Sequence, residues 1–139
     1  MIVVDTNVIS ELMKASPAEF VVRWAATQPT ATLHVTSITQ AEVLHGILLL
    51  PAGKKREAIQ AAADAMFATE FAGRILPFAS SATAAYARIA SQRRRAGRPI
   101  SHFDAQIAAI ALSERASLAT GNVADFEDCG LKVIDPWGA

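Results

Sequence analysis

Short apolar runs alternate along this chain with longer segments in which apolar residues recur every three or four positions. The short runs predict five buried strands, at Ile2–Val4, Leu33–Ser37, Ile75–Phe78, Ser117–Ala119 and Lys132–Ile134. The segments between them predict helices with one apolar face, at Asn7–Met13, Ser16–Gln28, Thr39–Leu50, Lys54–Gly73, Ser80–Arg95 and Ser101–Arg115. Strands that alternate with helices indicate an α/β fold with a parallel sheet covered on both faces.

Two features refine this expected architecture. Ser16, Pro17 and Glu19 have the spacing of a helix start, with a cap, a proline in the first position and an acid in the third. The long Ala-rich helix Lys54–Gly73 lengthens the connection between the second and third strands. We expect this helix and the preceding one, Thr39–Leu50, to form a helical hairpin that projects from the sheet.

Composition limits the class of protein. A chain of 139 residues with 52 % hydrophobic and 19 % charged residues can form one folded domain over 1–139. Its 13 basic and 13 acidic residues give zero formal net charge, so any binding of nucleic acid must depend on local patches. The single Cys129 excludes an internal disulfide. With no leader sequence and no apolar run of about 20 residues, we expect a cytoplasmic protein without membrane association.

Acidic side chains occur where the carboxyl edge of the sheet is expected. Asp5 follows the first strand, and Glu42 lies in the helix after the second. Asp104 lies at the start of the helix that leads into the fourth strand, while Asn122 and Asp125 follow that strand. A helix that feeds a parallel strand begins near the carboxyl edge, where open α/β sheets bind ligands. Folding therefore brings these distant residues to one edge.

Each acid also has a purely structural interpretation. Asp5 can cap the helix after it, and Asp125 can cap the turn at Phe126. The other two acids fit capping boxes, in Thr39-x-x-Glu42 and Ser101-x-x-Asp104. Glu19 has the same helix-start position but belongs to no strand-end cluster, so we interpret it as a cap only.

Taken together, the acids favour a metal site. Several carboxylates in one pocket repel each other, and a cation relieves that repulsion. Oxygen ligands suit Mg²⁺ or Mn²⁺, and the sequence has no Cys or His cluster for zinc. The Asp-x-Asp motif of enzymes that form an aspartyl-phosphate is missing, because Asn7 takes the second position. This favours water as the nucleophile over a covalent mechanism.

Four motifs in this order resemble those of PIN-domain ribonucleases, and among them the VapC-type toxins of toxin–antitoxin pairs. The motifs are Asp5-Thr6-Asn7, Ser37 through Glu42 to Gly46, Asp104-Ala105-Gln106-Ile107-Ala108-Ala109, and Leu118-Ala119-Thr120-x-Asn122-x-x-Asp125-Phe126. The ending, Gly130 to Trp137, is similar to the FitB-like branch. Each motif alone is weak, but the four at these separations are specific.

The resemblance implies a PIN-like three-layer fold with strand order 3-2-1-4-5. It implies a homodimeric endoribonuclease that depends on Mg²⁺ or Mn²⁺, inhibited by a VapB-type (FitA-like) antitoxin through which it contacts DNA indirectly. It places the metal on Asp5, Asp104 and Glu42. Asn122 takes the fourth catalytic position, so either Asp125 supplies the charge missing there or the site works with three acids. The candidates to orient ligands or water are Asn7, Ser37 and Thr120.

Basic residues form two smaller clusters. Arg93, Arg94, Arg95 and Arg98 are the densest, and they predict either phosphate contact or a solvated helix end. The second cluster, residues 54–56, lies at a helix start, where the helix dipole disfavours cations.

Three functions remain open at this point. The leading one is a ribonuclease toxin. The second is a regulatory partner of a DNA-binding antitoxin with little nuclease activity of its own, and the third is a small-molecule phosphohydrolase. The RNA sequence that is cleaved and the number of metal ions do not follow from the sequence.

Overall fold

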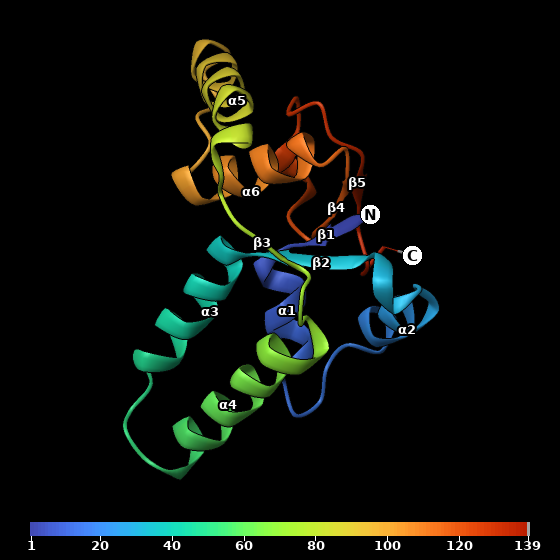
Figure 1. Cartoon of the computed structure of the whole chain (residues 1–139), viewed down its shortest axis with the longest axis vertical. Helices are drawn as coiled ribbons and strands as arrows, with labels where there is room; N and C mark the ends of the chain where they lie inside the picture. The colour runs from blue at the N-terminus through green and yellow to red at the C-terminus, as the bar shows by residue number, and fades with distance from the viewer. Residues whose placement is uncertain (139) are drawn as a thin grey trace.

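A five-stranded sheet forms the centre of the computed structural model, with helices on both faces (Figure 1). The structure describes residues 1–138, and the last residue of the predicted domain, Ala139, lies outside this range. The strands are β1 (Ile2–Val4), β2 (Leu33–Thr36), β3 (Ile75–Leu76), β4 (Ser117–Ala119) and β5 (Val133–Ile134). The α-helices are α1 (Thr6–Leu12), α2 (Glu19–Thr27), α3 (Ser37–Leu48), α4 (Lys54–Ala65), α5 (Thr83–Arg95) and α6 (His102–Ser113).

Short helical turns complete the chain. Three of them are 3-10 turns, at η1 (Thr30–Thr32), η3 (Ser80–Ala82) and η4 (Val123–Phe126), and η2 (Met66–Glu70) is a π-helical turn that continues α4. In the part of the chain that the structure describes, no helix combines the length and apolar composition of a membrane span.

All neighbouring strands are parallel, in the order β3-β2-β1-β4-β5. The predicted α/β fold, the parallel sheet and its strand order are therefore confirmed. The central strand β1 pairs with β2 on one side and with β4 on the other, with Ile2 opposite both Leu33 and Ser117. Consecutive side chains of a strand point to opposite faces. Val3 and Val4 are both buried, so β1 contributes to a core on each face.

The two cores define the two helical layers. On one face, Val4 and Val35 pack with buried residues of α1, α2, α3 and α4. On the other, Val3 and Leu118 pack with α5, α6 and Phe126. Figure 1 shows α1 and α4 on one side of the sheet and α5 and α6 on the other. The three-layer arrangement follows from apolar residues on both sides of the strands.

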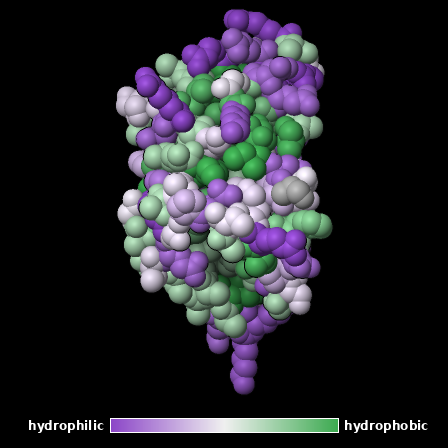
Figure 2. Space-filling view, turned by 90° about the vertical axis from the view of Figure 1, so that its right-hand side faces the viewer, coloured by the Kyte–Doolittle hydropathy of each residue, from purple (hydrophilic) through white to green (hydrophobic). Residues whose placement is uncertain are grey.

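The predicted hairpin is present. In Figure 1, α3 and α4 extend away from the sheet side by side, joined by a turn at their far end. Gly53 lies in that turn with a φ of 151°, which residues with a side chain rarely adopt. Figure 2 shows hydrophobic and hydrophilic side chains interspersed on the face that carries α2 and the chain ends.

The predicted start of the second helix is wrong. The helix begins at Glu19, and its N-cap is Ala18, which makes no side-chain cap bond. Ser16 and Pro17 precede the helix. The Glu11 carboxylate accepts a hydrogen bond from the Ala18 N–H at 3.0 Å. The Glu11 side chain of α1 therefore pairs with the free N–H group at the start of α2. The spacing of residues around Ala18 does not reveal this contact.

The predicted cap of α3 is also wrong. The cap is Thr36, whose hydroxyl accepts a hydrogen bond from the Thr39 N–H at 3.0 Å. The helix consequently begins at Ser37, earlier than the predicted Thr39. Glu42 lies in the second turn and has no part in a capping box. The capping interpretation of this acid is thereby removed.

Three smaller differences concern element ends. Strand β3 stops at Leu76 because Pro77, which has no backbone N–H to donate, follows it. The helix predicted over Lys54–Gly73 ends as an α-helix at Ala65 and continues in η2. Strand β5 begins at Val133, one residue later than expected.

We predict that Thr36→Val destabilises the protein by about 1 to 2 kcal/mol, because it leaves the buried Thr39 N–H without an acceptor. Valine keeps the shape of threonine, so packing changes little. The free energy of unfolding is measured by urea denaturation. Thr69→Val, at an exposed threonine, is the control. Equal losses in the two variants would show that the cap does not contribute.

Candidate active site

The carboxyl ends of β1 and β4 meet at one edge of the sheet. The strand ladder continues past the last paired residues, since the Asp5 N–H donates to the Ala119 carbonyl and the Thr120 N–H to the Ile134 carbonyl, both at 2.9 Å. This pairing places Asp5 beside Thr120, although the two are far apart in sequence. Sequence analysis predicted this edge as the position of the site.

Asp5 is buried, with only 4 % of its surface exposed. One carboxylate oxygen accepts from the Thr6 N–H and the other from the Thr120 hydroxyl, both at 2.8 Å. Burial raises the pKa of Asp5 to about 6, against the lowering effect of the two hydrogen bonds. This value includes a smaller raising effect of the nearby carboxylates of Asp104 and Glu42. Asp5 therefore caps α1 and also belongs to an acidic cluster.

A polar network fixes the loop after β4. The Asn7 side-chain amide donates to the Thr120 hydroxyl at 3.1 Å, and its oxygen accepts from the Gly121 N–H at 3.2 Å. The Asn122 N–H donates to the same hydroxyl at 3.0 Å. Thr120 thus donates to Asp5 while it accepts from two amides. Asn7 and Thr120 orient Asp5 and this loop, and their predicted role toward a ligand or water stays a prediction.

Glu42 faces the same region from α3. One of its oxygens accepts from the Thr6 hydroxyl at 2.8 Å, and that hydroxyl lies 2.9 Å from the Thr39 hydroxyl. The threonine that follows Asp5 thus links the second acid to the first. The Asp-Thr-Asn sequence after β1 therefore contributes an acid and two side chains that orient acids.

Asp104 reaches the edge from the first turn of α6. The Ser101 hydroxyl caps this helix and accepts from the Asp104 N–H at 3.1 Å, as predicted. Burial raises the pKa of Asp104, a hydrogen bond with Ser101 lowers it, the nearby Asp125 raises it and Arg93 lowers it. A carboxyl group that is half-buried near other acids ionises less readily than a free one.

The side chains of Asp5, Glu42 and Asp104 line one cavity of about 450 Å³. Its lining residues are Asp5, Thr6, Asn7, Ser10, Glu11, Lys14, Glu42, Asp104, Asn122 and Trp137. Three of the predicted catalytic and ligand-orienting residues do not line it, namely Ser37, Thr120 and Asp125. Ser37 begins α3, while Thr120 is fully buried behind Asp5. Asp125 is exposed and acts on Asp104 only through its charge.

Sequence reasoning assigned no site role to five lining residues, namely Thr6, Ser10, Glu11, Lys14 and Trp137. Ser10, Glu11 and Lys14 lie three to seven positions after Asn7, the spacing of one helical face, and this was the available signal. Lys14 pairs with Glu11 at 2.9 Å and lowers the pKa of that carboxyl group. Trp137 lines the cavity and packs against Gly121. A Cβ added to Gly121 would lie 2.7 Å from the indole ring. Only folding brings the chain end to this position.

The donor chemistry of the cavity fits a hard divalent cation. Its acidic ligand candidates, Asp5, Glu42 and Asp104, offer only oxygen, which suits Mg²⁺ or Mn²⁺. Burial is the main cause that raises the pKa values of Asp5 and Asp104, and neighbouring acids add a smaller effect. Within residues 1–138, no three acids, histidines or cysteines are already close enough to hold a metal ion. The acids share a cavity without converging on one point.

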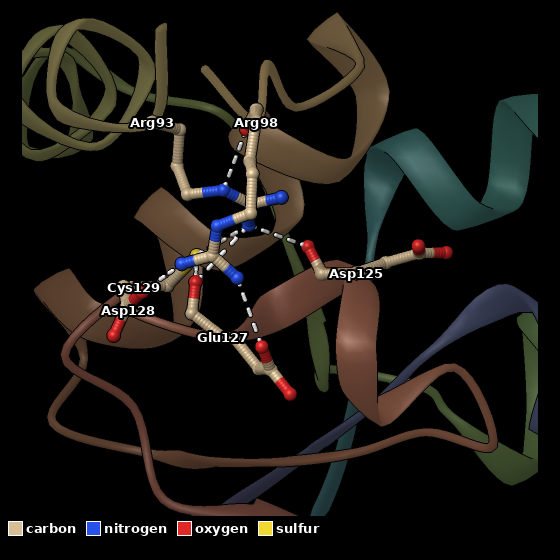
Figure 3. Close-up of polar contacts among 6 residues, drawn as sticks. All are labelled: Arg93, Arg98, Asp125, Glu127, Asp128 and Cys129. Carbon is tan, nitrogen blue, oxygen red and sulfur yellow. Dashed lines mark hydrogen bonds and ion pairs between the residues drawn. The ribbon is translucent and has the colours of Figure 1, made fainter. Parts of the chain in front are cut away.

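The predicted arginine patch requires a correction. Arg93 is buried, with 6 % of its surface exposed, because it continues the inner face of α5 after Ala85 and Ile89 at intervals of four residues. It therefore cannot contact a phosphate from the surface. Arg98 is exposed but pairs with Glu127 at 2.9 Å and with Asp128 (Figure 3). Arg94 and Arg95 remain exposed at the helix end.

We predict that Asp5→Asn stabilises the metal-free protein at about pH 7.5 by roughly 1 to 3 kcal/mol. The pKa of Asp5 is higher in the folded state than in the unfolded state. Ionisation of Asp5 therefore destabilises the native protein as pH rises from about 4 through 6. Asparagine removes that titration. The advantage should therefore vanish near pH 4, as measured by urea denaturation at both pH values. Asp64→Asn, at an exposed acid, is the control, and a loss of stability at both pH values in Asp5→Asn would contradict the prediction.

Comparison with known proteins matches residues 2–129 to the PIN domain family. The chain is 41 % identical over 137 residues to the "VapC ribonuclease Y4jK" of Sinorhizobium fredii, covering 99 % of this chain and 98 % of that protein. It is 36 % identical over 137 residues to the "Toxin FitB" of Neisseria gonorrhoeae, covering 99 % of each.

Solved structures agree with these sequence matches. The structure titled "Crystal Structure of FitAcB from Neisseria gonorrhoeae" superposes with a TM-score of 0.93 at 36 % identity and covers all of both chains. A second, titled "Structure of FitAB bound to IR36 DNA fragment", gives a TM-score of 0.92 and covers 99 % of this chain and 96 % of that one. The chain belongs to the PIN-domain family and, within it, to the VapC- and FitB-type toxins of toxin–antitoxin systems.

Proposed function

We propose that this protein is a metal-dependent endoribonuclease and the toxin of a toxin–antitoxin pair. The observation that carries the proposal is the gathering of Asp5, Glu42 and Asp104, from three separate elements, on one cavity at the carboxyl edge of the sheet. The similarity to a protein named as a VapC ribonuclease supports the choice of RNA as substrate.

In this mechanism Asp5, Asp104 and Glu42 would hold Mg²⁺ or Mn²⁺. A bound divalent cation supplies Lewis-acid chemistry, since it acidifies water and offsets the charge that develops on phosphate oxygens. Thr120 and the Thr6 N–H hold the Asp5 carboxylate in place, and the Thr6 hydroxyl holds Glu42. These bonds reduce the reorganisation needed when the substrate arrives.

We propose Asn122 for the fourth position. It lines the cavity, whereas Asp125 does not. Its amide oxygen can accept a hydrogen bond from water or act as a neutral ligand. Asp125 contributes negative potential at Asp104 from outside the cavity.

We propose that an antitoxin controls this site. A largely apolar groove of about 710 Å³ runs between α1, α3 and α4 and shares Thr6, Ser10, Lys14 and Glu42 with the acidic cavity. A partner segment in this groove lies directly beside the acids. The solved FitAcB, FitAB and VapBC2 structures, the last two bound to DNA by their titles, support a partner of this kind and indirect DNA contact. By the same family resemblance we propose a homodimer.

We predict that Glu42→Gln and Asp104→Asn each reduce RNA cleavage by about 10²-fold or more while the fold stays intact. The reason is that each variant removes one charge from the proposed metal site. Cleavage is mapped on total cellular RNA with Mg²⁺ or Mn²⁺, and circular dichroism checks the fold. Glu57→Gln, at an exposed acid of α4, is the control.

The outcomes separate the competing functions. Variants that cleave RNA as the wild type does would remove these acids from the mechanism. Hydrolysis of simple phosphate esters without RNA cleavage would indicate a small-molecule phosphohydrolase. Absence of growth arrest when the wild type is expressed alone would favour a regulatory partner without nuclease activity.

Arg94 and Arg95 are the exposed remainder of the basic cluster, and we predict that they contact RNA phosphates. Binding affinity falls as salt rises, so a plot of log affinity against log salt has a negative slope. The double variant Arg94→Gln/Arg95→Gln should make this slope shallower by about 1 to 2, because fewer counterions are released. The maximal cleavage rate should change little. Binding is measured by filter retention over a range of salt concentrations. An unchanged slope would direct attention to residues 54–56 at the hairpin end.

A further inference from the structure

A buried guanidinium group lies behind the acidic edge. Arg93 is one of the few charged side chains in the interior of the described chain, with 6 % of its surface exposed. Its Nε donates to the Arg98 carbonyl at 2.8 Å, and its Nη1 donates to the carbonyls of Asp125 at 2.8 Å and Glu127 at 3.1 Å. Burial of a cation is costly unless its hydrogen bonds are satisfied. These backbone oxygens supply that compensation.

The acceptors belong to two different segments. Arg98 lies in the connection between α5 and α6, while Asp125 and Glu127 lie at the end of η4 and directly after it. Figure 3 shows the guanidinium group of Arg93 directed at both segments, with the Asp125 side chain pointing away from it. The Cys129 sulfur lies 3.7 Å from the same nitrogen. Arg93 therefore joins segments that have no covalent connection near this point.

Each of these segments carries part of the proposed active site. The connection after Arg98 runs to the Ser101 cap and so fixes the start of α6, where Asp104 lies. The turn η4 begins directly after Asn122, which lines the cavity. The separation of Asp104 and Asn122 thus depends on how the two segments lie relative to each other. In addition, the positive charge of Arg93 lowers the pKa of Asp104.

We propose that Arg93 is a positioning residue, whose guanidinium group holds the segment that carries Asp104 at a fixed separation from the segment that carries Asn122. The proposal rests on the metal-dependent nuclease function proposed above. The forked shape of the arginine side chain is essential to this role, since Nε and Nη1 donate to different segments. A lysine keeps the charge but has one nitrogen on a flexible stem, so it cannot reproduce the fork.

The experiment compares Arg93→Lys and Arg93→Met with the wild-type chain. Arg74 provides a matched control, because its guanidinium also donates to backbone carbonyls, those of Thr30, Leu33 and Glu70, but just before β3, away from the acidic edge. Arg74→Lys therefore removes the same kind of contact elsewhere. All proteins are studied at a temperature at which circular dichroism shows them folded.

Two readouts are taken. Hydrogen exchange in the metal-free protein should become faster in both Arg93 variants within residues 98–105 and 122–129, and remain unchanged there in Arg74→Lys. Calorimetric titration should show Mn²⁺ affinity about 10-fold or more weaker in both Arg93 variants, the size typical of groups that position metal ligands. Arg74→Lys should bind Mn²⁺ as the wild type does.

Several results would overturn the proposal. Wild-type exchange and affinity in Arg93→Lys would show that charge alone is required, and equal weakening in Arg74→Lys would show a general effect of lost stability. Failure of Arg93→Lys to fold, when Arg74→Lys folds, would make Arg93 a residue of the whole fold and not of the site. A wild-type protein that binds no Mn²⁺ would instead contradict the proposed function, while the exchange measurement would still test Arg93.

Discussion

The rest of the site depends on a buried carboxylate at the junction of two parallel strands. Asp5 ends β1 and continues the ladder to β4, and Thr120 at the end of β4 donates to it. Removing this group from water makes its charge costly, as the raised pKa shows. Nearby acids add to that cost. The strand order that buries the core thus also buries this carboxylate near other acids, and the proposed function places a cation there.

The two helical layers bring the remaining acids to this position. On the face of α1 and α3, the Thr6 hydroxyl connects the first acid to Glu42. On the opposite face, the Ser101 cap sets the start of α6 and with it Asp104. The acids therefore come from both sides of the sheet, and packing of each layer against its own core fixes their approach. A change in either layer alters the geometry of the site.

Sequence patterns predicted the features that depend on strand direction. The positions of Asp5 and Asp104 at one edge follow from parallel topology, and Ser101 was recognisable as a cap. Contacts between distant segments were not predictable. Glu11 accepts from the Ala18 N–H in place of a local cap, and Thr36, a residue of the strand, caps the helix that follows it. Arg93 appeared as one of several surface arginines, because its acceptors are backbone oxygens that sequence does not reveal.

The most direct test of the central claim is to locate Mn²⁺ in crystals of the protein by anomalous scattering. The account predicts a peak inside the cavity, with oxygen atoms of Asp5, Glu42 and Asp104 as its protein ligands or as partners of its bound water. The Asp5 carboxylate should keep its hydrogen bond from Thr120. A peak elsewhere on the molecule, or a cavity without a peak at saturating Mn²⁺, would contradict the account.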